Sequence, residues 1–230
     1  ALAFAYALSL NERGVEALRE VRRVLGRDPD SARGWYTLAW LLRTSESRQD
    51  QEEAHGAARK SLALAEDERT RTLAAGLSMR GGRFKEAAAD YAQLTRLQPT
   101  QAYYRFWLGM ALLGSEDCAA RPALAQAVQL QKNWGEAHLV LARAEAICGL
   151  GETARRRVES LLRVKDDPDT RLTLALAELS LGRESVARQM ATAELPHPDA
   201  KALLDALDQK TMPRLPFSQE SAWWLPAEIR

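Results

Sequence analysis

The chain has 230 residues, of which 46% are hydrophobic and 27% are charged, a balance typical of globular proteins. Its formal net charge of +1 argues against a nucleic-acid-binding or membrane-surface protein, which would carry a basic excess. No apolar run approaches the roughly 20 residues that span a bilayer, so we expect no direct membrane insertion.

Taken in chain order, the apolar residues recur with the helical period of 3.6, and glycine and proline fall mainly between the apolar runs. The pattern predicts helix pairs within residues 1–31, 32–67, 68–101, 102–134, 135–167 and 168–199. The polar stretch 45–53 is predicted to be a loop insertion. A capping helix is predicted at 200–211, followed by an extended aromatic tail at 212–230.

The helix pairs repeat in sequence. Residues 137–162 align with residues 170–195 at a constant offset, with glycine in phase at Gly149 and Gly182. The other identities place Leu139, Leu141, Ala142, Ala144, Glu145, Ala154 and Arg155 opposite Leu172, Leu174, Ala175, Ala177, Glu178, Ala187 and Arg188. Such self-similarity indicates a stack of helix pairs, because one pair cannot bury its apolar face alone.

A helix pair of about 34 residues whose second helix runs out at a proline, as at Pro29 and Pro99, resembles the tetratricopeptide repeat. In the second pair, Trp35, Leu38, Ala39 and Leu42 stand at that family's first-helix positions, and Ala54 and Ala58 at its second-helix positions. The resemblance implies an all-α, right-handed α-solenoid of about six tetratricopeptide helix pairs at residues 1–199.

The last two pairs depart from the family pattern. Glu145 and Glu178 stand where an aromatic side chain is expected. We interpret both carboxylates as salt-bridge or capping groups, with Arg143 or Arg155 as their partners, rather than as a pair of catalytic acids.

In this family the first helices line a concave groove. The resemblance therefore implies a partner-binding groove formed by Arg33, Tyr36, Trp40, Arg43, Arg69, Met79, Tyr103, Phe106, Met110, Leu139, Arg143, Leu172 and Leu176. The aromatic and aliphatic character of these positions departs from the basic clamp with which chaperone-binding members hold a terminal carboxylate, so we reject that mode. An apolar or amphipathic segment suits the groove better. The alternative for Trp40, Tyr103 and Phe106, that they pack between repeats, remains open.

The tail ends in SAWWLPAEIR, an unusually apolar terminus. Phe217, Trp223, Trp224 and Ile229 would suit an apolar groove, so we expect the tail to dock in its own groove or in that of a second copy, giving a homodimer.

The two cysteines belong to neighbouring antiparallel helices. Cys118 lies at the start of the fourth pair's second helix and Cys148 at the end of the next helix, so a disulfide is geometrically possible. It would suggest an oxidising compartment such as a periplasm. Two buried thiols are the interpretation we prefer, because disulfides are rare inside helical solenoids.

Nothing in the sequence indicates catalysis. His55, His138 and His197 lack metal-ligand spacing, and no phosphate-binding loop is present. We therefore expect no cofactor, no metal and no enzyme activity.

The sequence favours a scaffold or adaptor that binds a protein or peptide, with no nucleic acid as partner. The alternative is the repeat domain of a larger protein, such as a regulator, a glycosyltransferase or an exopolysaccharide-export component. Residue usage is typical of bacteria, and the compartment is open between cytoplasm and periplasm.

Overall fold

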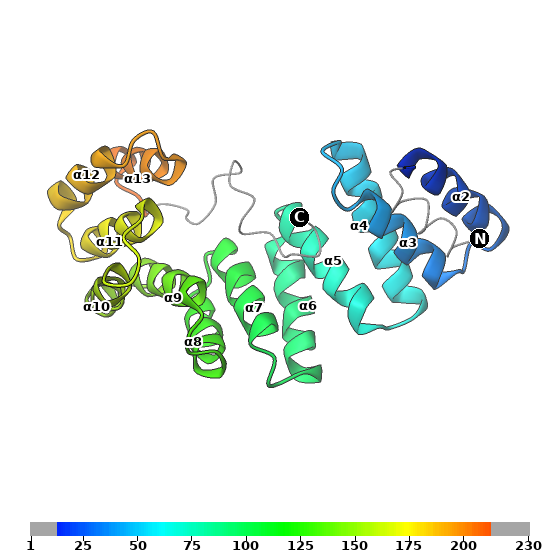
Figure 1. The fold of residues 1–230 in the computed structure, drawn as a ribbon, viewed down its shortest axis with the longest axis horizontal. Helices are drawn as coiled ribbons and strands as arrows, with labels where there is room; N and C mark the ends of the chain where they lie inside the picture. The colour runs from blue at the N-terminus through cyan, green and yellow to red at the C-terminus, as the bar shows by residue number, and fades with distance from the viewer. Residues whose placement is uncertain (1–12, 213–230) are drawn as a thin grey trace. The chain divides into compact units, whose positions relative to one another are not determined.

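The computed structural model describes residues 13–212, and within that range all regular structure is helical (Figure 1). The helices are α2 (Gly14–Arg27), α3 (Ala32–Leu42), α4 (Arg48–Leu64), α5 (Glu68–Arg80), α6 (Phe84–Leu97), α7 (Ala102–Gly114), α8 (Ala120–Leu130), α9 (Gly135–Ile147), α10 (Gly151–Leu162), α11 (Pro168–Ser180), α12 (Glu184–Ala193) and α13 (Pro198–Gln209). The predicted all-α class is confirmed for these residues. None of the described helices is long and apolar enough to cross a membrane.

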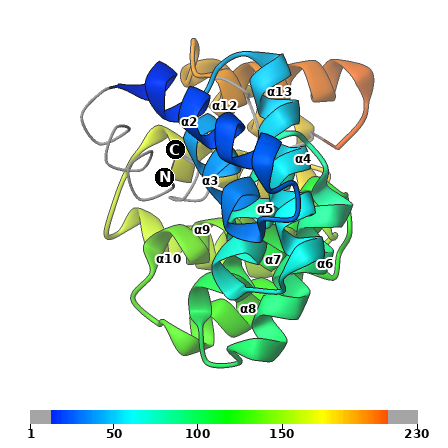
Figure 2. The same cartoon turned by 90° about the vertical axis from the view of Figure 1, so that its right-hand side faces the viewer.

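The described residues form two compact units, 13–97 and 98–212. In the first unit each helix from α2 to α6 packs against the next, and α3 also contacts α5 (Figures 1 and 2). Short turns make successive helices antiparallel, so α3 with α4 and α5 with α6 are helix pairs. Small residues such as Ala39, Ala58 and Ala75 are fully buried, which allows the close approach of the helix backbones.

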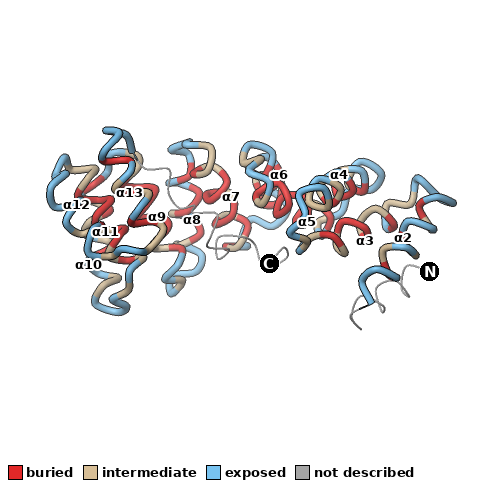
Figure 3. Tube along the Cα trace, turned by 90° about the horizontal axis from the view of Figure 1, so that it is seen from above, coloured by how far each residue is buried: buried red, intermediate tan, exposed pale blue. Residues whose placement is uncertain are grey.

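The second unit repeats this arrangement from α7 to α12, and α13 covers its end by packing on α11 and α12. The first helices of adjacent pairs also meet, because α9 contacts both α7 and α11. Buried positions run along most of α9 and α11, in keeping with helices that are covered on several sides (Figure 3). Helices in this position need apolar or well-paired side chains around most of their circumference.

The predicted loop insertion at residues 45–53 is wrong. Ser47 is the N-cap of α4, with its side-chain oxygen accepting a hydrogen bond from the Asp50 amide at 3.4 Å, and the helix begins at Arg48. Ser45 supports this start, because its hydroxyl donates to the Asp50 carboxylate at 2.7 Å. The polar residues are therefore the exposed first turns of a helix with a serine cap.

Two helical glycines differ in what surrounds them. A Cβ added at Gly109 in α7 would lie 2.8 Å from Leu124 Cδ2 and 3.3 Å from the Ala120 carbonyl oxygen, whereas a Cβ at Gly56 in α4 would meet nothing within 4 Å. Glycine at position 109 is thus required for the contact between α7 and α8.

We expect Gly109→Ala to lower the free energy of unfolding by about 1–3 kcal/mol through overpacking against Leu124. The matched control, Gly56→Ala, should raise it by about 0.5–1 kcal/mol, because alanine favours the helix where space is free. Urea denaturation followed by circular dichroism measures both. A stabilised Gly109→Ala variant would contradict the close approach.

Candidate functional site

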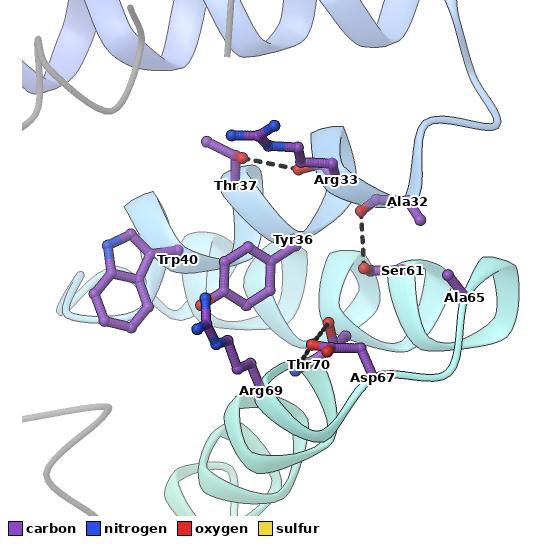
Figure 4. A pocket seen from close by; sticks show the side chains of 10 residues that line it. All are labelled: Ala32, Arg33, Tyr36, Thr37, Trp40, Ser61, Ala65, Asp67, Arg69 and Thr70. Atoms are coloured by element: carbon purple, nitrogen blue, oxygen red, sulfur yellow. Dashed lines mark hydrogen bonds between the residues drawn. The ribbon is translucent and has the colours of Figure 1, made fainter. Parts of the chain in front are cut away.

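A pocket of about 850 Å³ opens in the first unit between α3 and α5, with the end of α4 as its floor (Figure 4). Its walls are Ala32, Arg33, Tyr36, Thr37 and Trp40 from α3, Ser61 and Ala65 from the end of α4, and Asp67, Arg69 and Thr70 from the start of α5. The pocket thus lies on the face that two successive first helices share, here called the α3–α5 pocket.

The serine and threonine hydroxyls of the α3–α5 pocket are engaged within the fold. The Thr37 hydroxyl donates to the Arg33 carbonyl at 2.8 Å, and the Ser61 hydroxyl donates to the Ala32 carbonyl at 2.8 Å. Asp67 is the N-cap of α5, and its carboxylate accepts the Thr70 amide at 3.0 Å and the Thr70 hydroxyl at 3.3 Å. These bonds fix the start of α5 and hold α4 against α3.

An aromatic pair forms one wall of the pocket. The rings of Tyr36 and Trp40, one helical turn apart on α3, have centroids 6.3 Å apart and planes at 18°. The Arg43 guanidinium carbon lies 3.7 Å from the Trp40 ring centroid, and its Nη1 donates to the Trp40 carbonyl at 2.7 Å. Arg43 therefore stacks on the indole and stabilises the position of the ring.

Two cations complete the site. Arg33 and Arg69 are exposed at the pocket wall, from α3 and α5 respectively (Figure 4). Among the described residues neither guanidinium has an ion-pair or hydrogen-bond partner. By contrast, Arg71, two residues further along α5, pairs with Asp90 at 2.9 Å and with Glu66 at 2.6 Å.

The structure brings four of the predicted groove residues together in this pocket: Arg33, Tyr36, Trp40 and Arg69. Tyr103 and Leu139, in the second unit, are partly exposed. Six others have buried side chains: Met79, Phe106, Met110, Arg143, Leu172 and Leu176. Phe106 packs against Trp107 and Trp134, with ring centroids 5.2 Å and 4.5 Å away.

Arg143 occupies an ionic cluster rather than an open surface. Its side chain is 0% exposed. Its guanidinium lies 3.3 Å from Asp199 on α13 and 3.3 Å from Asp169 on α11, and its Nε donates to the Thr173 hydroxyl at 2.9 Å. Burial raises the pKa of the Asp199 carboxyl, and the Arg143 charge opposes that rise.

The expected partners of the two buried glutamates were wrong. Glu145 pairs with Arg157 on α10, at 2.8 and 2.9 Å, and Glu178 pairs with Arg183 at 2.9 Å. Each carboxylate therefore holds an arginine from the turn or second helix of its own pair, and neither reaches Arg143 or Arg155.

The preferred interpretation of the cysteines, two buried free thiols, is also wrong. The structure joins Cys118 to Cys148 in a disulfide with a Cα–Cα distance of 5.8 Å, and Cys118 is exposed. The bond ties the turn before α8 to the end of α9.

The histidines have structural partners. His55 lies 3.1 Å from the Ser78 hydroxyl and 3.3 Å from Glu86, and burial lowers its pKa. His138 Nε2 lies 2.8 Å from the Lys132 carbonyl, and His197 caps α13. Across the described residues, no group of three potential metal ligands comes together.

A second pocket, of about 550 Å³, lies in the second unit between the turn at Lys132 and the end of α10. Its main cation, Arg157, is already engaged by Glu145 and lies 3.3 Å from His138 Nδ1. The α3–α5 pocket, with two available guanidinium groups, is therefore the stronger candidate.

Sequence reasoning missed six of the ten residues that line this pocket. Ser61, Ala65, Asp67 and Thr70 come from the end of one pair and the start of the next, positions that the family groove pattern does not include. The aspartate just before α5 was a detectable signal, because an acidic N-cap marks a helix start. The predicted docking residues Phe217, Trp223, Trp224 and Ile229 lie outside the described residues.

No protein-family model matches the sequence, and no curated protein matches it. Solved structures do match. A tetratricopeptide repeat protein from Parabacteroides merdae is similar with a TM-score of 0.74 at 15% identity, over 91% of this chain and 84% of that chain. YrrB, a tetratricopeptide protein with an unusual peptide-binding site, gives 0.58 at 19% identity, over 82% and 97%.

PilW, a type IV pilus biogenesis factor, gives a TM-score of 0.62 at 16% identity, over 88% of this chain and 96% of that chain. These identities are too low to carry a function from one protein to another, but the agreement in helix order and packing is extensive. The described chain is therefore a helical repeat protein with the tetratricopeptide-repeat fold.

Proposed function

We propose that this protein is a non-enzymatic scaffold that holds an apolar or amphipathic segment of a protein partner against the first helices α3 and α5. The observation that carries the proposal is the α3–α5 pocket, which joins the stacked pair Tyr36 and Trp40 to two arginines at its wall. Its volume of about 850 Å³ is in the range of specific binding sites.

The chemistry of the pocket favours binding over reaction. The hydroxyls of Thr37 and Ser61 donate to backbone carbonyls, that of Thr70 donates to the Asp67 carboxylate, and no histidine or cysteine lines the pocket. Partly exposed tyrosine and tryptophan side chains are the residue types that most often anchor a bound partner. The peptide-binding site for which YrrB is known gives a precedent within the same fold.

The C-terminal tail is a candidate occupant of this pocket. We propose that residues 212–230 cover the pocket through Trp223 and Trp224, in the same chain or in a second copy, until a partner displaces them. The basis is composition, since the tail combines aromatic residues with three prolines, which disfavour a helix.

Selection of a phage-displayed library of random 12-residue peptides on the full chain tests the proposed function. We expect enriched peptides whose affinity falls about tenfold or more in Trp40→Ala, because a partly buried aromatic anchor typically contributes more than 1 kcal/mol. Leu97→Ala, which removes an exposed apolar side chain outside the pocket, should leave affinity unchanged.

The full chain carrying Trp223→Ala and Trp224→Ala tests the tail in the same assay. Higher affinity for the enriched peptides is expected if the tail covers the pocket, and unchanged affinity excludes that role. If no peptide is enriched, or if Trp40→Ala and Leu97→Ala behave alike, the pocket is not the binding site.

A further inference from the structure

We infer that the α3–α5 pocket selects protein segments that place an aspartate or glutamate side chain beside an aromatic or large apolar side chain. The inference rests on the proposed function and adds the chemistry of the ligand. It follows from which polar groups of the pocket remain available and from the balance of charge around it.

The cationic groups that the pocket offers to a ligand are hydrogen-bond donors. The hydroxyls of Thr37 and Ser61 are committed to backbone carbonyls, and the Asp67 carboxylate accepts from the amide and hydroxyl of Thr70. The guanidinium groups of Arg33 and Arg69 are not committed to any described residue. A guanidinium has five N–H donors and no acceptor, so a matching ligand must supply acceptor oxygens.

The charge around the pocket favours an anionic acceptor. Two arginines, Arg33 and Arg69, and a single carboxylate, that of Asp67, line the pocket. Asp67 stands at the N-terminus of α5, where the helix dipole compensates part of its charge. A ligand carboxylate at Arg33 or Arg69 would therefore gain charge-assisted hydrogen bonds, which are about twice as strong as neutral ones.

The position of the aromatic pair explains why the ligand also needs an aromatic or large apolar side chain. Tyr36 and Trp40 project from α3 one turn apart, and both line the same pocket as Arg33 and Arg69. A bound carboxylate is thereby held within reach of an aromatic wall, so the neighbouring side chain of the ligand is the one that contacts the rings. Aromatic and large apolar side chains gain most from such a contact.

The basic character is local, which favours a short protein segment over a nucleic acid. Several other arginines of the first unit are ion-paired: Arg59 pairs with Asp90 at 2.7 Å, and Arg22 pairs with Glu53 at 2.8 Å. A single-stranded nucleic acid needs a basic groove that follows its backbone over several nucleotides. The pocket itself is lined by two cations, Arg33 and Arg69, rather than by a basic stripe.

The test uses the peptides selected on the full chain. The probe is the most enriched peptide, synthesised with a fluorescent label and an amidated C-terminus, and a matched copy in which each aspartate becomes asparagine and each glutamate becomes glutamine. Fluorescence anisotropy measures both on the wild type, on Arg33→Gln/Arg69→Gln, and on Arg27→Gln/Arg48→Gln. The last variant removes two exposed arginines outside the pocket and controls for net charge.

We expect the acidic probe to bind the wild type about tenfold more tightly than its amide copy. This difference should disappear in Arg33→Gln/Arg69→Gln and persist in Arg27→Gln/Arg48→Gln. Circular dichroism and the retained binding of the amide copy show that the double variant is folded.

Three results would overturn the inference. If the selected peptides depend on Trp40 but are no richer in acidic residues than the library, the proposed function stands and the acidic preference is wrong. If Arg33→Gln/Arg69→Gln still binds the acidic probe more tightly than its amide copy, the preference for acidic residues arises from other residues. If a single-stranded 12-nucleotide DNA competes with the probe through Arg33 and Arg69 more strongly than the acidic peptide does, the pocket binds nucleic acid instead. Failure to enrich any peptide removes both proposals together.

Discussion

Replacing Asp199 with leucine is expected to lower the free energy of unfolding by about 3–5 kcal/mol, the usual cost of removing one partner from a buried ion pair. Asp199 is 2% exposed and lies 3.3 Å from Arg143, which is fully buried. The substitution removes the buried member of the pair of carboxylates around that guanidinium and leaves the more exposed Asp169. Urea denaturation followed by far-UV circular dichroism measures the change.

Two further variants separate charge from packing. Arg143→Met combined with Asp199→Leu should recover most of the lost stability, because a buried ion pair can often be exchanged for apolar side chains at little cost. Arg188→Ala removes an exposed bridge to Asp208, 2.7 Å long, that also tethers α13, and should change stability by no more than about 1 kcal/mol. If Asp199→Leu costs no more than Arg188→Ala, the buried cluster does not hold the end of the second unit.

Loss of the disulfide is expected to have a comparable effect. Cys118→Ser/Cys148→Ser should lower the free energy of unfolding by about 3–4 kcal/mol, since the bond closes a loop of sequence separation 30 and restricts the unfolded chain. Urea denaturation of the wild type and of the variant, each without and with reductant, measures the change.

Wild type with its disulfide reduced is the matched comparison for the double serine variant. Wild type treated with dithiothreitol should unfold at the urea concentration of the double serine variant, and the variant itself should not respond to the reductant. Alkylation without reductant, followed by intact-mass measurement, should add no label to the wild type. Labelling at both cysteines, together with equal stability of wild type and variant, would show that the bond does not form in solution.

The fold could be predicted because its determinants are local and repeat. Small residues at equivalent positions, such as Ala39 and Ala75, allow paired helices to approach, and apolar period together with glycine and proline spacing marks the turns. Within residues 13–212, segment 45–53 was predicted wrongly, because its polar residues are typical of a loop. Its helix depends on a serine cap and on solvent-facing turns, which apolar periodicity does not detect.

The candidate site could be predicted in part. Family positions on α3 and α5 identified four residues of the pocket, because a first-helix pattern fixes which way those side chains point. They could not identify Ser61, which enters the pocket from the end of α4, or Asp67, which lies just before α5. Nor could they show that Arg143 is buried, since its carboxylate partners come from α11 and α13, and contacts between non-adjacent segments leave no periodic signal.

The ion cluster at Arg143 also affects how the second unit comes apart. Repeat proteins usually behave as a chain of units coupled to their nearest neighbours, so that the terminal unit frays independently. Here one side chain of α9 bonds to α11 and to α13, two first helices further along. Detaching α13 exposes the buried guanidinium of Arg143, which belongs to α9. The stability of α13 is therefore coupled to a helix beyond its nearest neighbours. The end of this array should therefore exchange its amide hydrogens together with α9 and α11, as one cooperative block.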